Sequence, residues 1–439
     1  MPSHVLLGSM TAAVLATAVT VPAQAGGFGI PEIGVRRTAM ASTIGRPDEA
    51  SSIYHNPAGL VLRPGWNVYV SMGLSLVNTQ FELQQWEQSD QFLGVTANSD
   101  GYYDPVRPSR AMGVVPMIAA TGEILPGKLV LGVALFVGSA QGAAFEREAV
   151  TRYHLIDGYI VAPQAVVAAA YQVTDTLSVG ASAGVLHMRI HGKREVFPII
   201  DGMDVSNLTG TRPELLLDGQ GWAPTWMVSA FGRPHPRITW GATITGRVDT
   251  KLEGPVEITY SEDSPQPGDK LVGTQTTTQL LPWAFMAGAN FDLTPNVEIG
   301  TEFRYWLYRQ YKQQHTDIVG IFLVRELETM KNYNDSWQVS GGVRVHDLEF
   351  SPQLELMAGS HYDRTPAPPG TVTLDQPTFD HIGLHSGARY TTGRFRIGLS
   401  YIYYWYDIPT VTTSITAPPS NMRGNGSNNI FTVSLEAQL

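Results

Sequence analysis

The amino-acid sequence of 439 residues predicts an all-β protein, a transmembrane antiparallel β-barrel. Apolar residues alternate with small and polar residues in many segments, which is the period of two that strands require. These segments are joined alternately by short turns and by long polar loops, a pattern typical of outer-membrane barrels. After residue 25 we find no run of about 18 apolar residues, the minimum for a membrane-spanning helix.

The composition excludes several classes of protein. With 43% hydrophobic and 15% charged residues, the chain is too apolar for a long disordered protein. The 29 Lys and Arg residues against 39 Asp and Glu residues give a net charge of −10, which argues against binding to nucleic acid. The absence of cysteine excludes disulfides, thiol catalysis and Cys-ligated zinc.

Residues 1–25 have the pattern of a signal peptide. Residues 5–21 are largely apolar, and Pro22-Ala23-Gln24-Ala25 ends in the small-x-small pattern that signal peptidase recognises. His4 is the only candidate positive charge before the apolar stretch. We therefore expect cleavage before Gly26 and export of residues 26–439.

Residues 26–64 do not follow the strand rhythm. Arg36-Arg37-Thr38-Ala39-Met40-Ala41 and the stretch from Asp48 to Leu60 predict short helices with turns, whereas Asn56-Pro57 alone predicts only a turn. A barrel of a dozen or more strands has a lumen that is either open or filled. The segment is therefore a candidate plug, and residues 65–439 are the predicted barrel.

Five later segments show the alternation most clearly. One set of positions in each is mainly apolar or aromatic, and the other carries small, polar or charged residues. The first sets are Leu129, Leu131, Val133, Leu135 and Val137; Val297, Ile299, Thr301, Phe303 and Tyr305; Val339, Gly341, Val343 and Val345; Ile397, Leu399, Tyr401, Tyr403 and Trp405; and Phe431, Val433, Leu435, Ala437 and Leu439. We expect the second sets to line the lumen, and the aromatic clusters at 305–306 and 401–405 to lie at the membrane interfaces.

The connections between these segments differ in length. Thr174-Asp175-Thr176, Arg233-Pro234-His235-Pro236 and Leu293-Thr294-Pro295-Asn296 predict tight hairpin turns. Long polar loops are predicted over residues 84–110, 191–222, 255–279 and 362–380. A soluble propeller or sandwich would also contain many alternating strands, but we find no repeat of 40 to 50 residues of the kind that propellers show.

Several motifs in one order resemble the FadL family of outer-membrane transporters for long-chain fatty acids and other hydrophobic compounds. Gly26-Gly27-Phe28, Glu32, Asp48-Glu49-Ala50 and His55-Asn56-Pro57-Ala58-Gly59-Leu60 resemble its N-terminal hatch, whose Asn-Pro-Ala motif lies in the plug. Downstream, the likeness continues through Arg247 to Gly254, Leu280-Leu281-Pro282 before Ala287-Gly288-Ala289, Tyr333 to Trp337, Arg364-Thr365-Pro366, Pro377, Asp380, His381 and Gly387.

The resemblance implies a monomeric barrel of about 14 strands in the bacterial outer membrane, surrounded by outer-membrane lipids and inserted by the barrel assembly machinery. It also implies that Gly26, Gly27 and Phe28 reach into a hydrophobic pocket, and that Asn56, Pro57 and Ala58 belong to the plug. Ligand would enter from the extracellular side and leave laterally beside a kinked strand. Members commonly end in an aromatic residue, whereas this chain ends in Leu439.

Inward-facing arginines are the candidates for neutralising a fatty acid carboxylate. Alternation places Arg247, Arg304 and Arg344 on the lumen side of their strands. The competing interpretation is a charge network within the lumen that includes Glu298 and Glu302, because inward charges are ordinary in barrels. A neutral ligand would need no arginine.

A catalytic serine is not expected. Gly180-Ala181-Ser182-Ala183-Gly184 matches the G-x-S-x-G motif, which functions only at a sharp turn from strand to helix. Ser182 lies instead in an alternating run, so we expect a small residue that faces the lumen.

No metal site or cofactor is expected either. His187 and His191, like His381 and His385, lie two pleats apart in a strand, too far apart to share one ion. Asn98-Ser99-Asp100-Gly101 with Asp104 lacks the later Glu of a calcium loop.

The sequence thus predicts a non-enzymatic outer-membrane channel for the passive uptake of hydrophobic compounds, with long-chain fatty acids as the expected ligands. The alternatives are uptake of aromatic hydrocarbons, an outer-membrane lipid hydrolase that would use Ser182, and a structural surface protein. Deletion of Gly26, Gly27 and Phe28 distinguishes a structural surface protein from a transporter. For a transporter, uptake of radiolabelled oleate should fall while the barrel still assembles; unchanged uptake would contradict a role for these residues.

Overall fold

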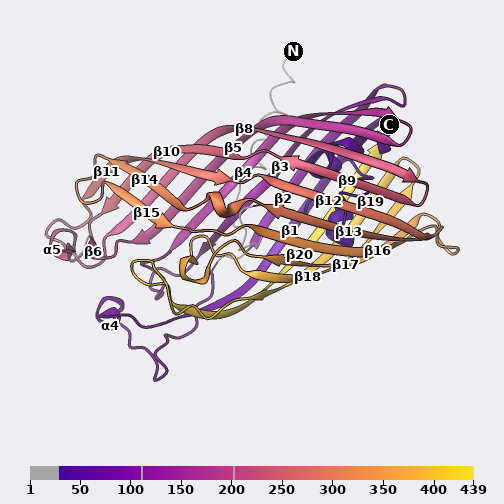
Figure 1. The fold of residues 1–439 in the computed structure, drawn as a ribbon. Coiled ribbons are helices and arrows are strands. Elements are labelled where there is room, and N and C mark those ends of the chain that lie inside the picture. The colour runs from indigo at the N-terminus through magenta and orange to yellow at the C-terminus, as the bar shows by residue number, and fades with distance from the viewer. Residues whose placement is uncertain (1–28, 110–111, 201–202) are drawn as a thin grey trace, which may run out of the picture.

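A closed barrel of long, tilted strands forms the molecule (Figure 1). The computed structural model describes residues 29–109, 112–200 and 203–439, so the predicted signal peptide and Gly26, Gly27 and Phe28 lie outside the described residues. Within the described residues, no helix combines the length and the apolar composition needed to cross a membrane.

Fourteen antiparallel strands build the wall, as the resemblance implied. The continuous ones are β1 (Trp66–Leu83), β2 (Met112–Leu125), β3 (Leu129–Ala144), β4 (Asp157–Thr174), β5 (Leu177–Glu195), β8 (Glu214–His235), β17 (Leu354–Arg364), β18 (Asp380–Thr392), β19 (Phe395–Asp407) and β20 (Met422–Gln438). The interrupted ones consist of β9 (Ile238–Thr245) with β10 (Val248–Thr259), β11 (Lys270–Leu281) with β12 (Ala284–Thr294), β13 (Val297–Trp306) with β14 (Gln313–Val319), and β15 (Glu326–Met330) with β16 (Ser336–Val345). β1 pairs with both β2 and β20, which closes the barrel.

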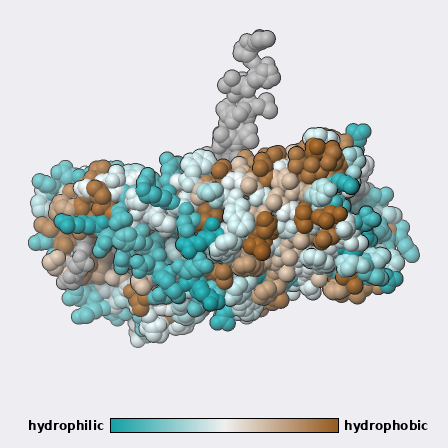
Figure 2. Space-filling model, turned by 45° about the horizontal axis from the view of Figure 1, so that its top comes forward, coloured by the Kyte–Doolittle hydropathy of each residue, from teal (hydrophilic) through white to brown (hydrophobic). Residues whose placement is uncertain are grey.

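The predicted alternation matches the two faces of the wall. Val133 is 53% exposed on the outside of β3, and Val433 is 52% exposed on β20, whereas its neighbour Ser434 is 5% exposed and faces the lumen. Figure 2 shows hydrophobic side chains gathered over one part of the barrel, and an end that is richer in hydrophilic side chains. Trp306 was wrongly expected at the membrane interface: it is 7% exposed and points inward.

The predicted turns connect β4 to β5, β8 to β9 and β12 to β13. The loops predicted over 191–222 and 255–279 were too long, because β5 and β8 extend to Glu195 and Glu214, and β10 and β11 to Thr259 and Lys270. The end of β5 is mainly polar, so backbone pairing continues there beyond the apolar pattern. The ends of β8 and β10 instead carry apolar residues, among them Leu215, Val256 and Ile258, which form a buried cluster. The long loops hold α4 (Ser89–Leu93), the hairpin of β6 (Ile199–Ile200) and β7 (Met203–Asp204), α5 (Ser206–Thr209) and η3 (Pro369–Thr371).

Residues 29–64, here called the lumenal segment, lie inside the barrel. The segment contains α2 (Val35–Met40), α3 (Ser52–His55) and the short 3-10 helix η1 (Pro57–Leu62). In Figure 1 it is the indigo coil within the wall, towards the end where the C-terminus lies. α2 packs against β16 to β20, and η1 packs against β3, β4, β5 and β8, so the segment spans the lumen from one side to the other.

Candidate functional site: the barrel interior

The Asn56-Pro57-Ala58 motif attaches the lumenal segment to the wall. Asn56 Nδ2 donates to the carbonyls of Ile44 at 3.0 Å and Ala230 at 3.2 Å. The amide of Ala58 donates to Ser229 Oγ at 2.9 Å, and Ser178 Oγ donates to the carbonyl of Ala58 at 2.8 Å. These contacts give the three residues an anchoring position against β5 and β8.

A buried ion network holds the other side of the segment. Asp48 lies 3.2 Å from Arg36, 3.0 Å from Arg344 on β16 and 3.0 Å from Arg389 on β18. Burial alone would raise the pKa of Asp48, but these three guanidiniums outweigh it and hold that pKa well below its usual range. Each arginine also has another carboxylate partner, so the charges are matched within the lumen.

The predicted arginines occupy two kinds of position. Arg344 belongs to the ion network, and Arg304 donates to Glu302 at 2.6 Å and to His55 Nδ1 at 3.3 Å. Burial, together with the charge of Arg304, lowers the pKa of His55 to about 3, which keeps this imidazole neutral. Glu298 and Glu302 participate as the network interpretation expected.

The inward placement predicted for Arg247 is wrong. Its side chain is 38% exposed and pairs with Asp249 at 2.8 Å. The break between β9 and β10 shifts the alternation by one residue: Thr243 is buried before it, whereas Val248 and Thr250 are buried after it. Odd-numbered side chains therefore turn outward beyond the break.

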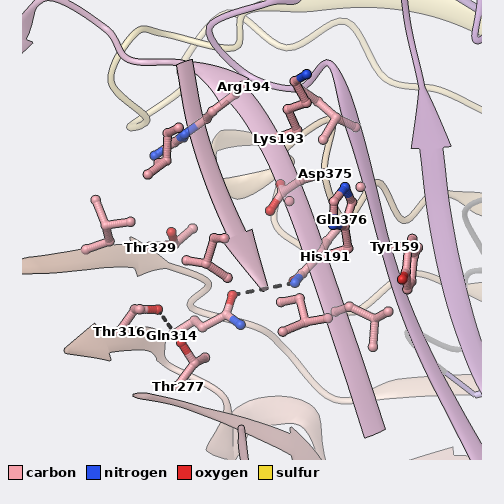
Figure 3. Close-up of a pocket in the computed structure, with 18 of the residues that line it drawn as sticks. Tyr159, His191, Lys193, Arg194, Thr277, Gln314, Thr316, Thr329, Asp375 and Gln376 are labelled. Atoms are coloured by element: carbon pink, nitrogen blue, oxygen red, sulfur yellow. Dashed lines mark hydrogen bonds between the residues drawn. The ribbon is translucent and has the colours of Figure 1, made fainter. Parts of the chain in front are cut away.

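A first cavity, here called the outer cavity, lies in the half of the barrel near the long loops. Its volume is about 120 Å³. Gln376 reaches from the loop between β17 and β18 towards Gln314 on β14, and Thr277 faces Thr316 (Figure 3). The remaining lining residues are His154, Leu155, Gly158, Tyr159, Ile160, Ile190, His191, Gly192, Lys193, Arg194, Leu215, Leu217, Leu327, Thr329 and Asp375.

Asp375 is the carboxylate among the residues that line the outer cavity, and three titratable side chains lie near it. It acts electrostatically on His154, Arg194 and Lys331. Lys331 does not itself line the cavity: it is fully buried, and its Nζ has no hydrogen-bond partner among the described residues. Burial lowers the pKa of Lys331, and Asp375 opposes that shift. Sequence reasoning missed this group, because its members belong to separate loops and strands and share no motif.

A second cavity of about 120 Å³, here called the inner cavity, lies nearer the lumenal segment. Its lining is mostly apolar and includes Phe136, Val166, Met227, Met286 and Trp306. Ser182 lines it from within β5, with no helix following, so the context of a nucleophile elbow is absent.

The start of the lumenal segment lies beside the inner cavity. The amide of Ile30 donates to the carbonyl of Gly138 at 3.0 Å, and Gly29 forms an isolated bridge with Ser139. The pairing of β3 with β4 shifts between Val137 and Ser139, which bends the wall at this point.

Three histidines form a further buried cluster. His361 Nδ1 lies 2.7 Å from His385 Nε2, and His385 Nδ1 bonds the carbonyl of Thr38 in α2 at 2.9 Å. His361, on β17, stands opposite Gly383 and therefore between His381 and His385. The cluster braces α2, and no group of three or more His, Asp or Glu side chains in the described part of the chain is arranged to hold a metal ion.

Comparisons with known proteins agree with this architecture. A crystal structure of a Pseudomonas aeruginosa FadL homologue superposes with a TM-score of 0.77 at 13% identity, covering 94% of this chain and 99% of that chain. The Ralstonia pickettii toluene transporter TbuX gives 0.66 at 16% identity, covering 94% and 99%. The Pseudomonas putida toluene transporter TodX gives 0.67 at 15% identity, covering 95% and 100%. At these identities the likeness shows the fold.

A comparison of the amino-acid sequence with protein-family models identifies the family. No curated protein matches the chain. The family model described as "Outer membrane protein transport protein (OMPP1/FadL/TodX)" matches residues 16–438. Because that match extends over nearly the whole chain, the protein belongs to the OMPP1/FadL/TodX family of outer membrane transport proteins, which are channels for hydrophobic compounds and not enzymes.

Proposed function

We propose that this protein takes up long-chain fatty acids through the outer membrane, with the carboxylate held at the outer cavity. The observation that carries the proposal is the set of basic side chains near Asp375. Arg194 and Asp375 line the cavity, Asp375 acts electrostatically on both Arg194 and Lys331, and the ammonium of Lys331 has no hydrogen bond among the described residues. A buried donor without a partner costs about 1–3 kcal/mol, so an anionic ligand would relieve a cost that a neutral ligand would leave.

The acyl chain would be accommodated by the apolar residues beyond the outer cavity. Each CH₂ group that leaves water contributes about 0.8 kcal/mol. The lining of the inner cavity is mostly apolar, and its one arginine, Arg304, is already bonded to Glu302. In the inner cavity, the acyl chain of the ligand rather than its carboxylate would therefore determine binding.

We place the exit at the bend of β3. The regular pairing with β4 is lost between Val137 and Ser139, and the amide of Ile30 covers the carbonyl of Gly138. Movement of the lumenal segment's first residues would uncover this bend beside the inner cavity and let the ligand pass laterally into the membrane. Such a path leaves the ion network around Asp48 intact.

The variant Lys331→Met tests the role assigned to the ammonium. Hydrogen bonds to charged groups contribute about 1.5–3 kcal/mol, so oleate should bind the purified full-length protein roughly 10- to 100-fold more weakly. Oleyl alcohol, which lacks the carboxylate, should bind unchanged. Lys251→Met is the matched control, because Lys251 is 65% exposed and pairs with Glu253 away from the cavity. Equal loss for both ligands would contradict a role in carboxylate recognition.

Aromatic hydrocarbons are the second candidate ligands. The inner cavity favours these ligands because its lining is mostly apolar and its arginine, Arg304, is already paired with Glu302. Toluene should then bind to the unmodified protein while oleate does not, and Lys331→Met should affect neither. Binding isotherms for the two ligands on the same preparation separate the candidates.

A further inference from the structure

The outer and inner cavities lie at different heights along the same two strands. Ile160 on β4 lines the outer cavity, and Gln164 lines the inner one. Four residues of strand correspond to about 13 Å. The cavities are thus successive chambers along the barrel, and the side chains between them decide whether they communicate.

A layer of apolar side chains fills the space between these heights. Ala162 on β4, Leu186 and Met188 on β5, and Leu252 on β10 have no exposed surface, and all four belong to one apolar cluster. Leu186 stands beside Gln164 in the β4–β5 pairing, at the edge of the inner cavity. Ile190, one inward position beyond Met188, lines the outer cavity.

The layer continues on the neighbouring strands, from β11 to β14. Tyr311 is 3% exposed and follows Tyr308, which lines the inner cavity. Gln279 is fully buried and accepts hydrogen bonds from Tyr311 Oη at 3.4 Å and from Gln314 Nε2 at 3.1 Å. Because Gln314 lines the outer cavity, these bonds link β11 to that chamber.

The size of each chamber requires this layer to move. A cavity of about 120 Å³ is smaller than the roughly 300–1,000 Å³ of pockets that hold drug-sized ligands. A long-chain ligand therefore cannot lie in one chamber without displacing its neighbours. Unbranched methionine side chains adopt many shapes at low cost, which makes Met188 the member best suited to move.

We propose that Leu186 and Met188 form an inner gate, which separates the chamber that captures ligand from the chamber beside the β3 bend. The gate sets the width of the molecules that pass. This inference rests on the proposed function, and it assigns selectivity to side chains of the wall in addition to the lumenal segment.

Widening the gate tests its role in selectivity. The double variant Leu186→Ala/Met188→Ala should raise the uptake of a dodecanoic acid that ends in a pyrene ring by about tenfold relative to oleate, since pocket fit discriminates by such factors. Val185→Ala is the matched control, because Val185 is 46% exposed on the outer face of the same strand. An unchanged ratio of the two uptake rates would overturn the gate.

Narrowing the gate gives the opposite result. In Ala162→Phe, oleate uptake should fall at least tenfold while the purified protein still binds hexanoate, whose short chain does not have to cross the gate. Uptake equal to that of the unmodified protein would again overturn the gate. If the unmodified protein binds no oleate at all, the proposed function fails, and the uptake ratio for neutral ligands of different widths then decides the gate independently.

Discussion

Asp48→Asn should make the channel leaky while leaving the barrel assembled. Asparagine keeps the shape of the side chain but removes the charge that faces Arg36, Arg344 and Arg389. Removing one partner of a buried ion pair costs about 3–5 kcal/mol. The cost here lies below that range, because Asp48 is 19% exposed and each arginine keeps a second carboxylate, but the three guanidiniums lose the carboxylate that they share. We therefore expect the lumenal segment to detach from β16 and β18, and the permeability of protein-containing vesicles to sugars to rise at least tenfold.

An exposed aspartate provides the control for this experiment. Asp317 is 65% exposed and pairs with His315, so Asp317→Asn should leave permeability unchanged. Vesicles with Asp48→Asn that remain as tight as the unmodified ones would show that the network does not retain the segment. The pH dependence is a second check. Because the pKa of Asp48 is depressed, its contribution is present above its unfolded pKa of about 3.9 and is lost only below that value, so the unmodified channel should stay closed at pH 5.

Gly241→Ala should loosen the other side of the lumenal segment. A methyl group at this position of β9 would lie 1.9 Å from the carbonyl oxygen of Ile44 and 2.5 Å from Asn56 Nδ2. Overpacking of this kind costs about 1–3 kcal/mol, and here it also breaks the bond between Asn56 and Ile44. The segment should become accessible to protease added to the purified protein.

Gly73→Ala is the matched control for the methyl group itself. Its added carbon would lie 3.4 Å from Val115 Cβ, an ordinary contact, and the position is also within a strand. This variant should resist protease like the unmodified protein. Equal resistance of Gly241→Ala would mean that the segment adapts to the methyl group without leaving the wall.

Strand periodicity was sufficient to orient most of the wall. Glu302 and Arg304 were placed in the lumen correctly, because side chains alternate strictly within an unbroken strand. Arg247 was misplaced because the interruption beside Gly246 changes which positions face inward, and no sequence signal marks it. The extent of β5 was underestimated for a related reason: pairing of backbone groups does not require an apolar face. In β8 the missed residues include Leu215-Leu216-Leu217, an apolar run that does not alternate.

The candidate site was much less accessible to sequence reasoning. The pairing of Asp48 with Arg389 joins the start of the chain to a strand near its end. Lys331 lies in the interruption between β15 and β16 and Asp375 in the loop after β17, and the two segments share no motif. Their significance depends on burial and on the number of opposite charges nearby, which are properties of the closed barrel.

The pairing of β1 with β20 has a consequence for how the protein folds. Asn67 pairs with Gln438, and the amide of Leu439 donates to the carbonyl of Trp66, so the ring is completed by contacts between the most distant strands of the barrel. Closing so long a loop is entropically costly, and contacts of this separation form slowly. The lumenal segment precedes all the strands yet is enclosed by them, so it has to be in place before the last strand docks. The order of folding is thereby constrained: the lumenal segment takes its place first, and β1 pairs with β20 last.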